Sequence, residues 1–175
     1  RTQTEGEKFV HQEALRCFSA LTARQFDVAL RCIDKKALEE VRHRYLKQRV
    51  LPNYKRVPLE LQLAFGREVT KEHLKNMEPV ALLSGALAGT VRALEIGSYR
   101  MRNIHFTVRK TLHRIQEVYE VRIAASADVV GGRQYKRYTL QYVVLAHFVD
   151  GSVRFQVPQF ILDLVGPTPR QHFVQ

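Results

Sequence analysis

The sequence predicts an α+β domain in which N-terminal helices pack on a curved antiparallel β-meander. Apolar residues recur at helical spacing through the first half of the chain and alternate with polar residues through the second half, where turn dipeptides separate the alternating runs. A chain of 175 residues can bury a core of its own. We therefore expect one domain over residues 1–175, mainly helical over 1–97, a sheet over 98–157 and a tail over 158–175.

The helical half begins with a capping box. Thr4 and Glu7 have the T-x-x-E spacing in which each side chain bonds the backbone N–H of the other residue. Thr22 with Gln25 has the same spacing and predicts a second helix start. Asp34 is the expected N-cap of a third helix.

The stretch from Pro52 to residue 78 does not decide between strand and helix. Apolar residues alternate over 59–65, as in a strand, but leucine and glutamate favour helix. Thr70 is expected to open a short helix. Pro79 then begins the most apolar stretch, which ends near residue 91. It is shorter than the roughly 20 residues that span a bilayer, so we expect a buried helix, with Gly85 and Gly89 packed closely on the sheet.

The second half has the pattern of hairpin-connected strands. Apolar residues alternate over 104–108, 119–123 and 138–148, and again over 153–157. Asp150-Gly151 is a dipeptide favoured in type I′ turns, and Gly131-Gly132 marks another hairpin. An antiparallel meander of this kind packs one face against helices and leaves the other in water.

The two cysteines, Cys17 and Cys32, fall at apolar positions of expected helices. A single disulfide is one interpretation, but two cysteines do not form a disulfide framework. We expect buried free thiols, which are typical of a reducing compartment.

Three segments carry a resemblance to a known family. They are EALRCFSALTARQFDVALRCIDKKALEEV, the pair YRMRNIHFTVRK and YEVRIAASADV, and YTLQYVVLAHFVDGSVRFQV. Over about residues 5–50 and 98–157 they resemble the Tim44-like family, whose cone-shaped plan is shared by nuclear transport factor 2-like (NTF2-like) domains. The resemblance implies a non-enzymatic module of the mitochondrial matrix or of the matrix surface of the inner membrane, with no catalytic residues to carry over.

The resemblance leaves three hypotheses for the function. The first is a structural protein of the mitochondrial large ribosomal subunit, with ribosomal RNA and ribosomal proteins as partners, which orients the ribosome to the anionic inner membrane. The second is an inner-membrane component of protein import or of respiratory-complex assembly. The third is an NTF2-like enzyme or small-molecule binder, although we expect no small-molecule substrate.

An excess of positive charge is the most informative feature of the composition. The chain has 28 Lys and Arg against 17 Asp and Glu, a net charge of +11, which favours polyanionic partners. Tyr99 and Tyr135 lie beside basic residues, where an aromatic ring could stack on an unpaired base. The expected nucleic-acid-binding residues are Arg100, Arg102, Arg109, Lys110, Arg114, Arg133, Lys136 and Arg137. A second basic zone, for RNA or membrane, comprises Lys35, Lys36, Arg42, Arg44, Lys47, Arg49, Lys55 and Arg56.

The sequence contains no pattern typical of catalysis or of metal binding. The seven histidines are dispersed, and neither cysteine has a second ligand at zinc-site spacing. We therefore expect no enzyme, no metal and no cofactor. Were the cone an enzyme, Asp128, His105, His147 and Tyr142 would be the candidates for an acid–base pair.

Overall fold

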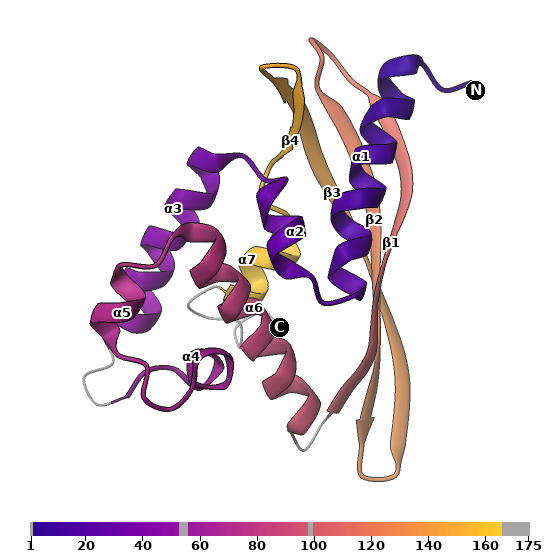
Figure 1. Ribbon diagram of the computed structural model, residues 1–175. Coiled ribbons are helices and arrows are strands. Elements are labelled where there is room, and N and C mark those ends of the chain that lie inside the picture. Colours follow the sequence, from indigo (N-terminus) through magenta and orange to yellow (C-terminus); the bar gives the residue numbers. More distant parts are fainter. Residues whose placement is uncertain (1, 53–55, 98–99, 166–175) are drawn as a thin grey trace.

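The computed structural model describes residues 2–52, 56–97 and 100–165 (Figure 1). Seven helical segments precede the sheet and one follows it. They are α1 (Glu5–Thr22), α2 (Phe26–Arg31), α3 (Lys35–Tyr45), the π-helical turn η1 (Leu46–Val50), α4 (Leu59–Phe65), α5 (Lys71–Lys75), α6 (Pro79–Ile96) and, after the sheet, α7 (Gln159–Val165). The strands are β1 (Arg100–His113), β2 (Tyr119–Gly131), β3 (Gln134–Val149) and β4 (Ser152–Phe155).

The four strands form one antiparallel sheet in the order β1-β2-β3-β4, so each strand pairs with its neighbour in the chain. The sheet is curved, and α1 lies along β1 on its concave side (Figure 1). The predicted fold class is confirmed: helices cover one face of a curved antiparallel meander, in the cone-like arrangement of NTF2-like domains. Within the described ranges, no helix covers the opposite face, which we call the outer face.

The predicted hairpins are confirmed by the backbone at the turns. Asp150 and Gly151 both have positive φ, 50° and 79°, as a type I′ turn requires. Gly132 has φ 57° and lies in the two-residue connection between the paired residues Gly131 and Gln134. These tight connections hold β2, β3 and β4 in a continuous meander.

Three of the four helix starts predicted at a threonine or aspartate are confirmed, and at one of them, the start of α5, the Thr70 hydroxyl accepts a hydrogen bond from the His73 N–H at 3.1 Å. Thr4 and Glu7 form the capping box at the start of α1, and Asp34 accepts a hydrogen bond from the Ala37 N–H at 3.0 Å. The cap predicted at Thr22 is wrong, because its hydroxyl accepts a hydrogen bond from the Phe106 N–H at 2.9 Å. Thr22 therefore fastens the end of α1 to the edge of β1.

The alternating residues 59–65 of the ambiguous stretch after Pro52 are helical, since α4 covers Leu59–Phe65. The expectation that Gly85 and Gly89 pack on the sheet is wrong. A Cβ at Gly89 would overlap the backbone carbonyl of Glu60, and one at Gly85 would overlap the Phe65 ring. Both glycines thus allow α6 to approach α4.

The segment after Pro158 is not only a tail. Gln159–Val165 forms α7, and its Phe160 and Ile161 side chains are buried in the core. Phe160 packs against the rings of Phe18, Phe106 and Tyr142. Helix α7 therefore helps to close the interior of the cone.

Helix α6 forms the apolar centre of the helical layer. It contacts α2, α3, α4, α7 and β1, and its Leu82, Leu83, Leu87 and Val91 side chains are buried. Helix α6 is also long and apolar enough to cross a membrane. No other helix in the described ranges meets this test of length and composition. The contacts of α6 in the core agree with the expected buried helix.

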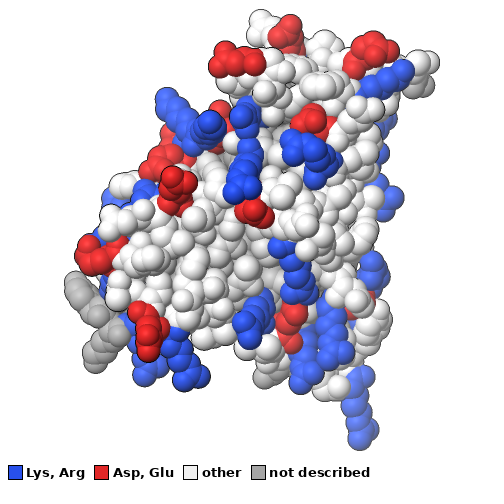
Figure 2. Space-filling view, viewed as in Figure 1, with Lys and Arg blue, Asp and Glu red and all other residues white. Residues whose placement is uncertain are grey.

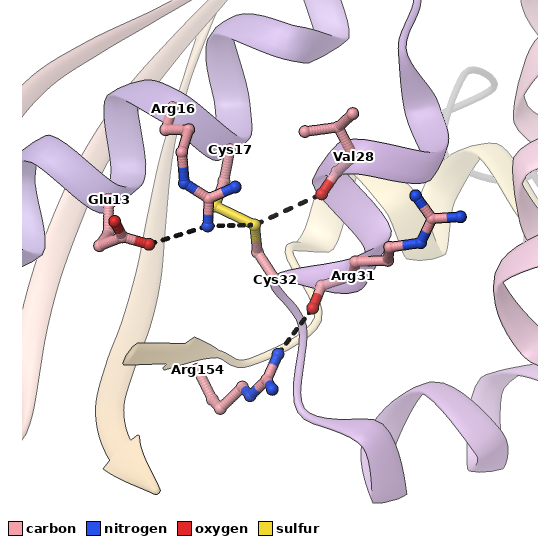
Figure 3. A network of polar contacts seen from close by, with 7 residues as sticks. All are labelled: Glu13, Arg16, Cys17, Val28, Arg31, Cys32 and Arg154. Carbon is pink, nitrogen blue, oxygen red and sulfur yellow. Dashed lines mark hydrogen bonds and ion pairs between the residues drawn. A yellow bond between two sulfur atoms is a disulfide. The ribbon is translucent and has the colours of Figure 1, made fainter. Parts of the chain in front are cut away.

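The prediction of free thiols is wrong. Cys17 and Cys32 form a disulfide that joins α1 to the end of α2, with Cα atoms 6.2 Å apart (Figure 3). The Arg16 guanidinium lies 3.7 Å from Cys32 Sγ and donates a hydrogen bond to Glu13 at 2.9 Å. The argument for a reducing compartment, which depended on free thiols, therefore no longer holds.

The disulfide also lies close to the last strand. The backbone of Phe155 in β4 donates to the Cys32 carbonyl at 3.0 Å and accepts from the Asp34 N–H at 2.9 Å. Arg154 donates to the Arg31 carbonyl at 2.7 Å (Figure 3). The link between α2 and α3 is thus held to α1 by sulfur and to β4 by backbone hydrogen bonds.

Candidate nucleic-acid interface and apolar cavity

The outer face of the sheet is built by strand alternation. In β2 the buried side chains of Val121 and Ile123 point toward the helices, so Arg122 between them points outward. Lys110 of β1 is paired with Arg122 and lies on the same side. Arg102 of β1 and Arg137 of β3 are both paired with Asp128. The register therefore brings cations from three strands to one face.

Most cations predicted to bind nucleic acid are exposed and have no partner carboxylate of their own. Figure 2 shows blue side chains along the edge where Figure 1 has β1 and at the lower end, with fewer red ones among them. Among the described residues, no ion pair forms with the exposed side chains of Arg100, Arg102, Arg109, Lys110, Arg133 and Lys136. This set is the candidate interface.

Two residues of the predicted set are neutralised internally. Arg137 Nη1 lies 2.9 Å from Asp128 Oδ1, and Arg114 Nη2 lies 2.8 Å from Glu120 Oε2. Arg122 Nη2 is also near Glu120, at 3.4 Å. Arg114 and Arg137 therefore stabilise the outer face and contribute less to its net field.

The carboxylates in these pairs are held in the charged form. A hydrogen bond from the Asn103 amide at 2.7 Å, together with Arg137, lowers the pKa of Asp128. The hydrogen bond from Arg114 lowers the pKa of Glu120. Conversely, the hydrogen bond to Asp128 raises the pKa of Tyr135, so this exposed ring stays neutral and available for stacking.

The second basic zone is divided by the structure. Arg42 donates to the backbone carbonyls of Met77 and Lys75 at 2.8 and 2.6 Å, and Arg49 pairs with Glu60 at 2.8 Å. These two guanidinium groups join helices to each other and are not surface ligands. Lys55 lies outside the described residues. Arg49 is exposed but paired, and the other exposed members are Lys35, Lys36, Arg44, Lys47 and Arg56. Helix α3 lies on the opposite side of the molecule from β1 (Figure 1).

An apolar cavity of about 140 Å³ lies between the helices and the concave face of the sheet. Its walls come from the end of α1, the start of α2, from α6 and α7, and from β1, β2 and β3. The large apolar side chains that line it include Leu21, Leu87, Val91, Phe106, Leu140 and Phe160. Tyr138 and Leu140 stand at the exposed side, with 48% and 58% of their surfaces accessible.

The catalytic candidates do not converge on this cavity. Asp128 points to the outer face, where Asn103 and Arg137 occupy its oxygens. His105 contacts Thr107 on the exposed side of β1, while Tyr142 packs against Phe160 in the interior. Among the described residues, no group of three or more His, Cys, Asp or Glu could hold a metal ion.

Neither the cavity nor the buried carboxylate Glu60 was predicted from the sequence. The cavity depends on how four helices meet the sheet, which no local pattern encodes. Glu60 accepts hydrogen bonds from Tyr45 at 3.0 Å and from Arg49, residues that are distant in the sequence. One signal was available, because a lone glutamate among the leucines of 59–63 needs a buried partner when that segment is helical.

No protein-family model, no curated protein and no solved structure matches the chain significantly.

Proposed function

We propose that the chain is a non-catalytic RNA-binding module, a structural component of the mitochondrial large ribosomal subunit. The observation that carries the proposal is the candidate interface, a group of exposed cations on the uncovered outer face and at the β2–β3 hairpin end, none of which pairs with a carboxylate of the described residues. Arginine and lysine neutralise phosphates and release counterions, which gives affinity that does not depend on sequence.

Of the two aromatic residues singled out beside these cations, Tyr135 favours RNA over a simple anionic surface, whereas Tyr99 lies outside the described residues. Tyr135 is 63% exposed and belongs to the same strand as Lys136 and Arg137. Unpaired bases stack on exposed rings, and each stack contributes about 1–3 kcal/mol. A tyrosine ring can also lie at a lipid interface, but only an unpaired base offers a stacking partner, so the combination supports single-stranded or looped RNA.

The ribosomal and mitochondrial part of the proposal depends on the resemblance to the Tim44-like family. It supplies ribosomal RNA and ribosomal proteins as partners, and peripheral contact with the inner membrane as a secondary role. The alternative, an inner-membrane component of protein import or of respiratory-complex assembly, differs in predicting a lipid partner for the same cations. Binding to RNA and to cardiolipin vesicles, measured side by side, separates the two.

Charge reversal tests the candidate interface. We expect the triple substitution Arg100→Glu, Arg102→Glu and Arg109→Glu to weaken binding of a structured RNA hairpin by at least tenfold at about 0.1 M salt, and to reduce the slope of log affinity against log salt. The matched control is Lys35→Glu, Lys36→Glu and Lys47→Glu, which changes the net charge equally on the other side of the molecule. Circular dichroism checks that both variants are folded.

Two results would contradict the proposal. Equal losses of RNA affinity in the triple variant and the control would show that net charge acts without a defined interface. Retention of the unsubstituted chain on cardiolipin vesicles, with no RNA affinity above that of an uncharged protein, would favour the membrane alternative.

The apolar cavity favours a second candidate function, binding of a small apolar molecule. Its described lining has large hydrophobic side chains and no acid–base pair, so the cavity suits binding rather than turnover. Displacement of a fluorescent fatty-acid probe, compared between the unsubstituted chain and Leu87→Trp, which would fill the cavity, tests this function.

A further inference from the structure

Strand β3 has a long edge without a partner strand. It pairs with β2 from Gln134 to Ala146, but with β4 only from Ala146 to Val149. Over Gln134–Gln141 every residue is exposed, and no described strand lies on the side away from β2. In Figure 1 this part of β3 belongs to the hairpin that extends past the end of α6. An open edge of this kind is a template for an added strand.

The register shows which backbone groups are available. Gly131 and Gln134 close a two-residue turn, so the N–H and C=O of Gln134 point toward β2. The direction of the backbone N–H and C=O groups alternates from one strand residue to the next. The N–H and C=O groups of Tyr135, Arg137 and Thr139 therefore point toward the open edge. A hydrogen bond near the other end of β3 supports this assignment. The carbonyl of Leu145, an even number of residues from Thr139, points away from β2 and accepts a hydrogen bond from the Gln156 N–H at 2.9 Å.

The open edge lies beside the apolar cavity. Tyr138 and Leu140 belong to the unpaired part of β3 and also line the cavity. A strand added along this edge would place every second side chain on the concave side of the sheet, next to these two residues. Backbone hydrogen bonds would then supply affinity, and the apolar residues at the cavity would select large hydrophobic side chains.

The charge at the hairpin end selects a further property of the partner. Arg133 lies in the turn, and the Lys136 ammonium lies over the Tyr138 ring, 4.9 Å from its centre. Neither cation has a carboxylate partner among the described residues. An acidic residue at one end of the added strand would complement both.

We infer that the open edge of β3 binds an extended segment of a partner protein, with hydrophobic residues at alternate positions and an acidic end beside Arg133 and Lys136. The segment would extend the sheet by one strand and insert hydrophobic side chains toward the cavity. This inference goes beyond the proposed RNA binding: it uses the strand edge, and it shares only Arg133 and Lys136 with the candidate interface.

A synthetic peptide tests the inference directly. The probe has Phe or Val at every second position, Thr between them and two Glu at one end, and its fluorescence anisotropy is titrated with the full chain. We expect saturable binding. The control is the same peptide with N-methyl groups on alternate backbone amides, which keeps the side chains and charge but prevents strand pairing. We expect it to bind at least tenfold more weakly.

Substitutions in β3 locate the site. Thr139→Pro removes an N–H that faces the open edge while leaving the ladder to β2 intact, and proline is tolerated on edge strands. We expect the peptide affinity of Thr139→Pro to be at least tenfold lower than that of the unsubstituted chain. We expect the affinity of Thr139→Ala to be unchanged. RNA affinity should be unchanged in Thr139→Pro, so failure of this inference is distinct from failure of the proposed function.

Three outcomes would overturn the inference. The N-methylated peptide could bind as tightly as the parent peptide, which would exclude strand addition. Thr139→Pro, folded by circular dichroism, could bind the peptide normally. The chain could instead form a dimer that Thr139→Pro dissociates, measured by light scattering, which would assign the edge to a second copy of this chain.

Discussion

Glu60 is a buried carboxylate that holds two other side chains in place. Its Oε1 accepts hydrogen bonds from the Tyr45 hydroxyl and from Arg49 Nε, and its Oε2 lies 3.1 Å from Arg49 Nη2. Burial opposes the charged form of Glu60, but the hydrogen bonds from Arg49 and Tyr45 outweigh it, so the net effect lowers the pKa of Glu60. Burial raises the pKa of Tyr45, so its hydroxyl remains a donor.

The disulfide is the other residue-scale feature with a measurable effect on stability. Cys17 and Cys32 are 15 residues apart, and closing a loop of about that length stabilises a fold by about 3 kcal/mol through the unfolded state. We expect the double variant Cys17→Ala and Cys32→Ala to have a free energy of unfolding lower by about 2–4 kcal/mol, measured by urea denaturation.

A chemical control distinguishes loss of the bridge from loss of side-chain volume. Dithiothreitol should lower the urea midpoint of the unsubstituted chain and leave the double variant unchanged. If the unsubstituted chain unfolds at the same urea concentration with and without dithiothreitol, the bridge does not contribute to stability as we expect.

The contact between α4 and α6 depends on a glycine. Because a Cβ at Gly89 would meet the backbone of Glu60, which cannot rotate away, the helices would have to separate. We expect Gly89→Ala to lower the free energy of unfolding by about 1–3 kcal/mol despite the better helix propensity of alanine. Thermal denaturation measures the change.

Two neighbouring substitutions serve as comparisons for Gly89→Ala. At Gly85 the obstacle is the Phe65 side chain, which can move, so Gly85→Ala should cost less than Gly89→Ala. Ala88→Gly, at an exposed position of the same helix, should cost about 1 kcal/mol through propensity alone. Equal stability of Gly89→Ala and the unsubstituted chain would mean that the two helices do not approach as closely as described.

Elements defined by local chemistry could be predicted from the sequence, and contacts between elements could not. The capping box at Thr4, the cap at Asp34 and the turn at Asp150-Gly151 each depend on a few adjacent residues. Thr22 was assigned wrongly, because its hydroxyl bonds β1, which lies 84 positions away in the chain. Helix α7 was missed because prolines surround it and its stability comes from burial of Phe160 and Ile161.

The candidate interface was partly predictable for the same reason. The excess of positive charge predicted that Arg100, Arg102 and Lys110 lie on the surface, and they are exposed. Composition alone could not show that Arg114 and Arg137 pair with Glu120 and Asp128 of β2. Nor could it show that Arg42 donates to backbone carbonyls. The number of charged residues gives the net charge of the molecule. Which carboxylate or carbonyl each cation contacts depends on the strand register and the packing, which composition does not specify.

Three carboxylates make the whole molecule sensitive to acid. The pKa values of Glu60, Glu120 and Asp128 are lowered in the folded state, so the unfolded chain binds protons at higher pH than the folded one. Their stabilising contribution is complete above the ordinary values, about 4.3 for Glu and about 3.9 for Asp, and is lost as the pH falls through the lowered values. We expect the urea midpoint to stay level between about pH 6 and pH 5 and to fall below about pH 4.5.

Single substitutions can assign this acid sensitivity. Glu60→Gln should lower the midpoint at neutral pH and make its fall below pH 4.5 shallower, because one of the three linked groups is gone. A midpoint that stays constant down to pH 3 in the unsubstituted chain would show that these carboxylates are not stabilised by their partners.

Both cysteines precede every strand in the order of synthesis. Oxidation of Cys17 and Cys32 therefore requires no residue of the sheet, and an emerging chain could acquire the α1–α2 link while β1 to β4 are still untranslated. The Cys32 carbonyl, held in place by the disulfide, would then accept the hydrogen bond from the Phe155 N–H. Phe155 is the last strand residue to be synthesised. The covalent bond would thus be made first, and the sheet would complete its assembly against a helix pair whose separation is already limited.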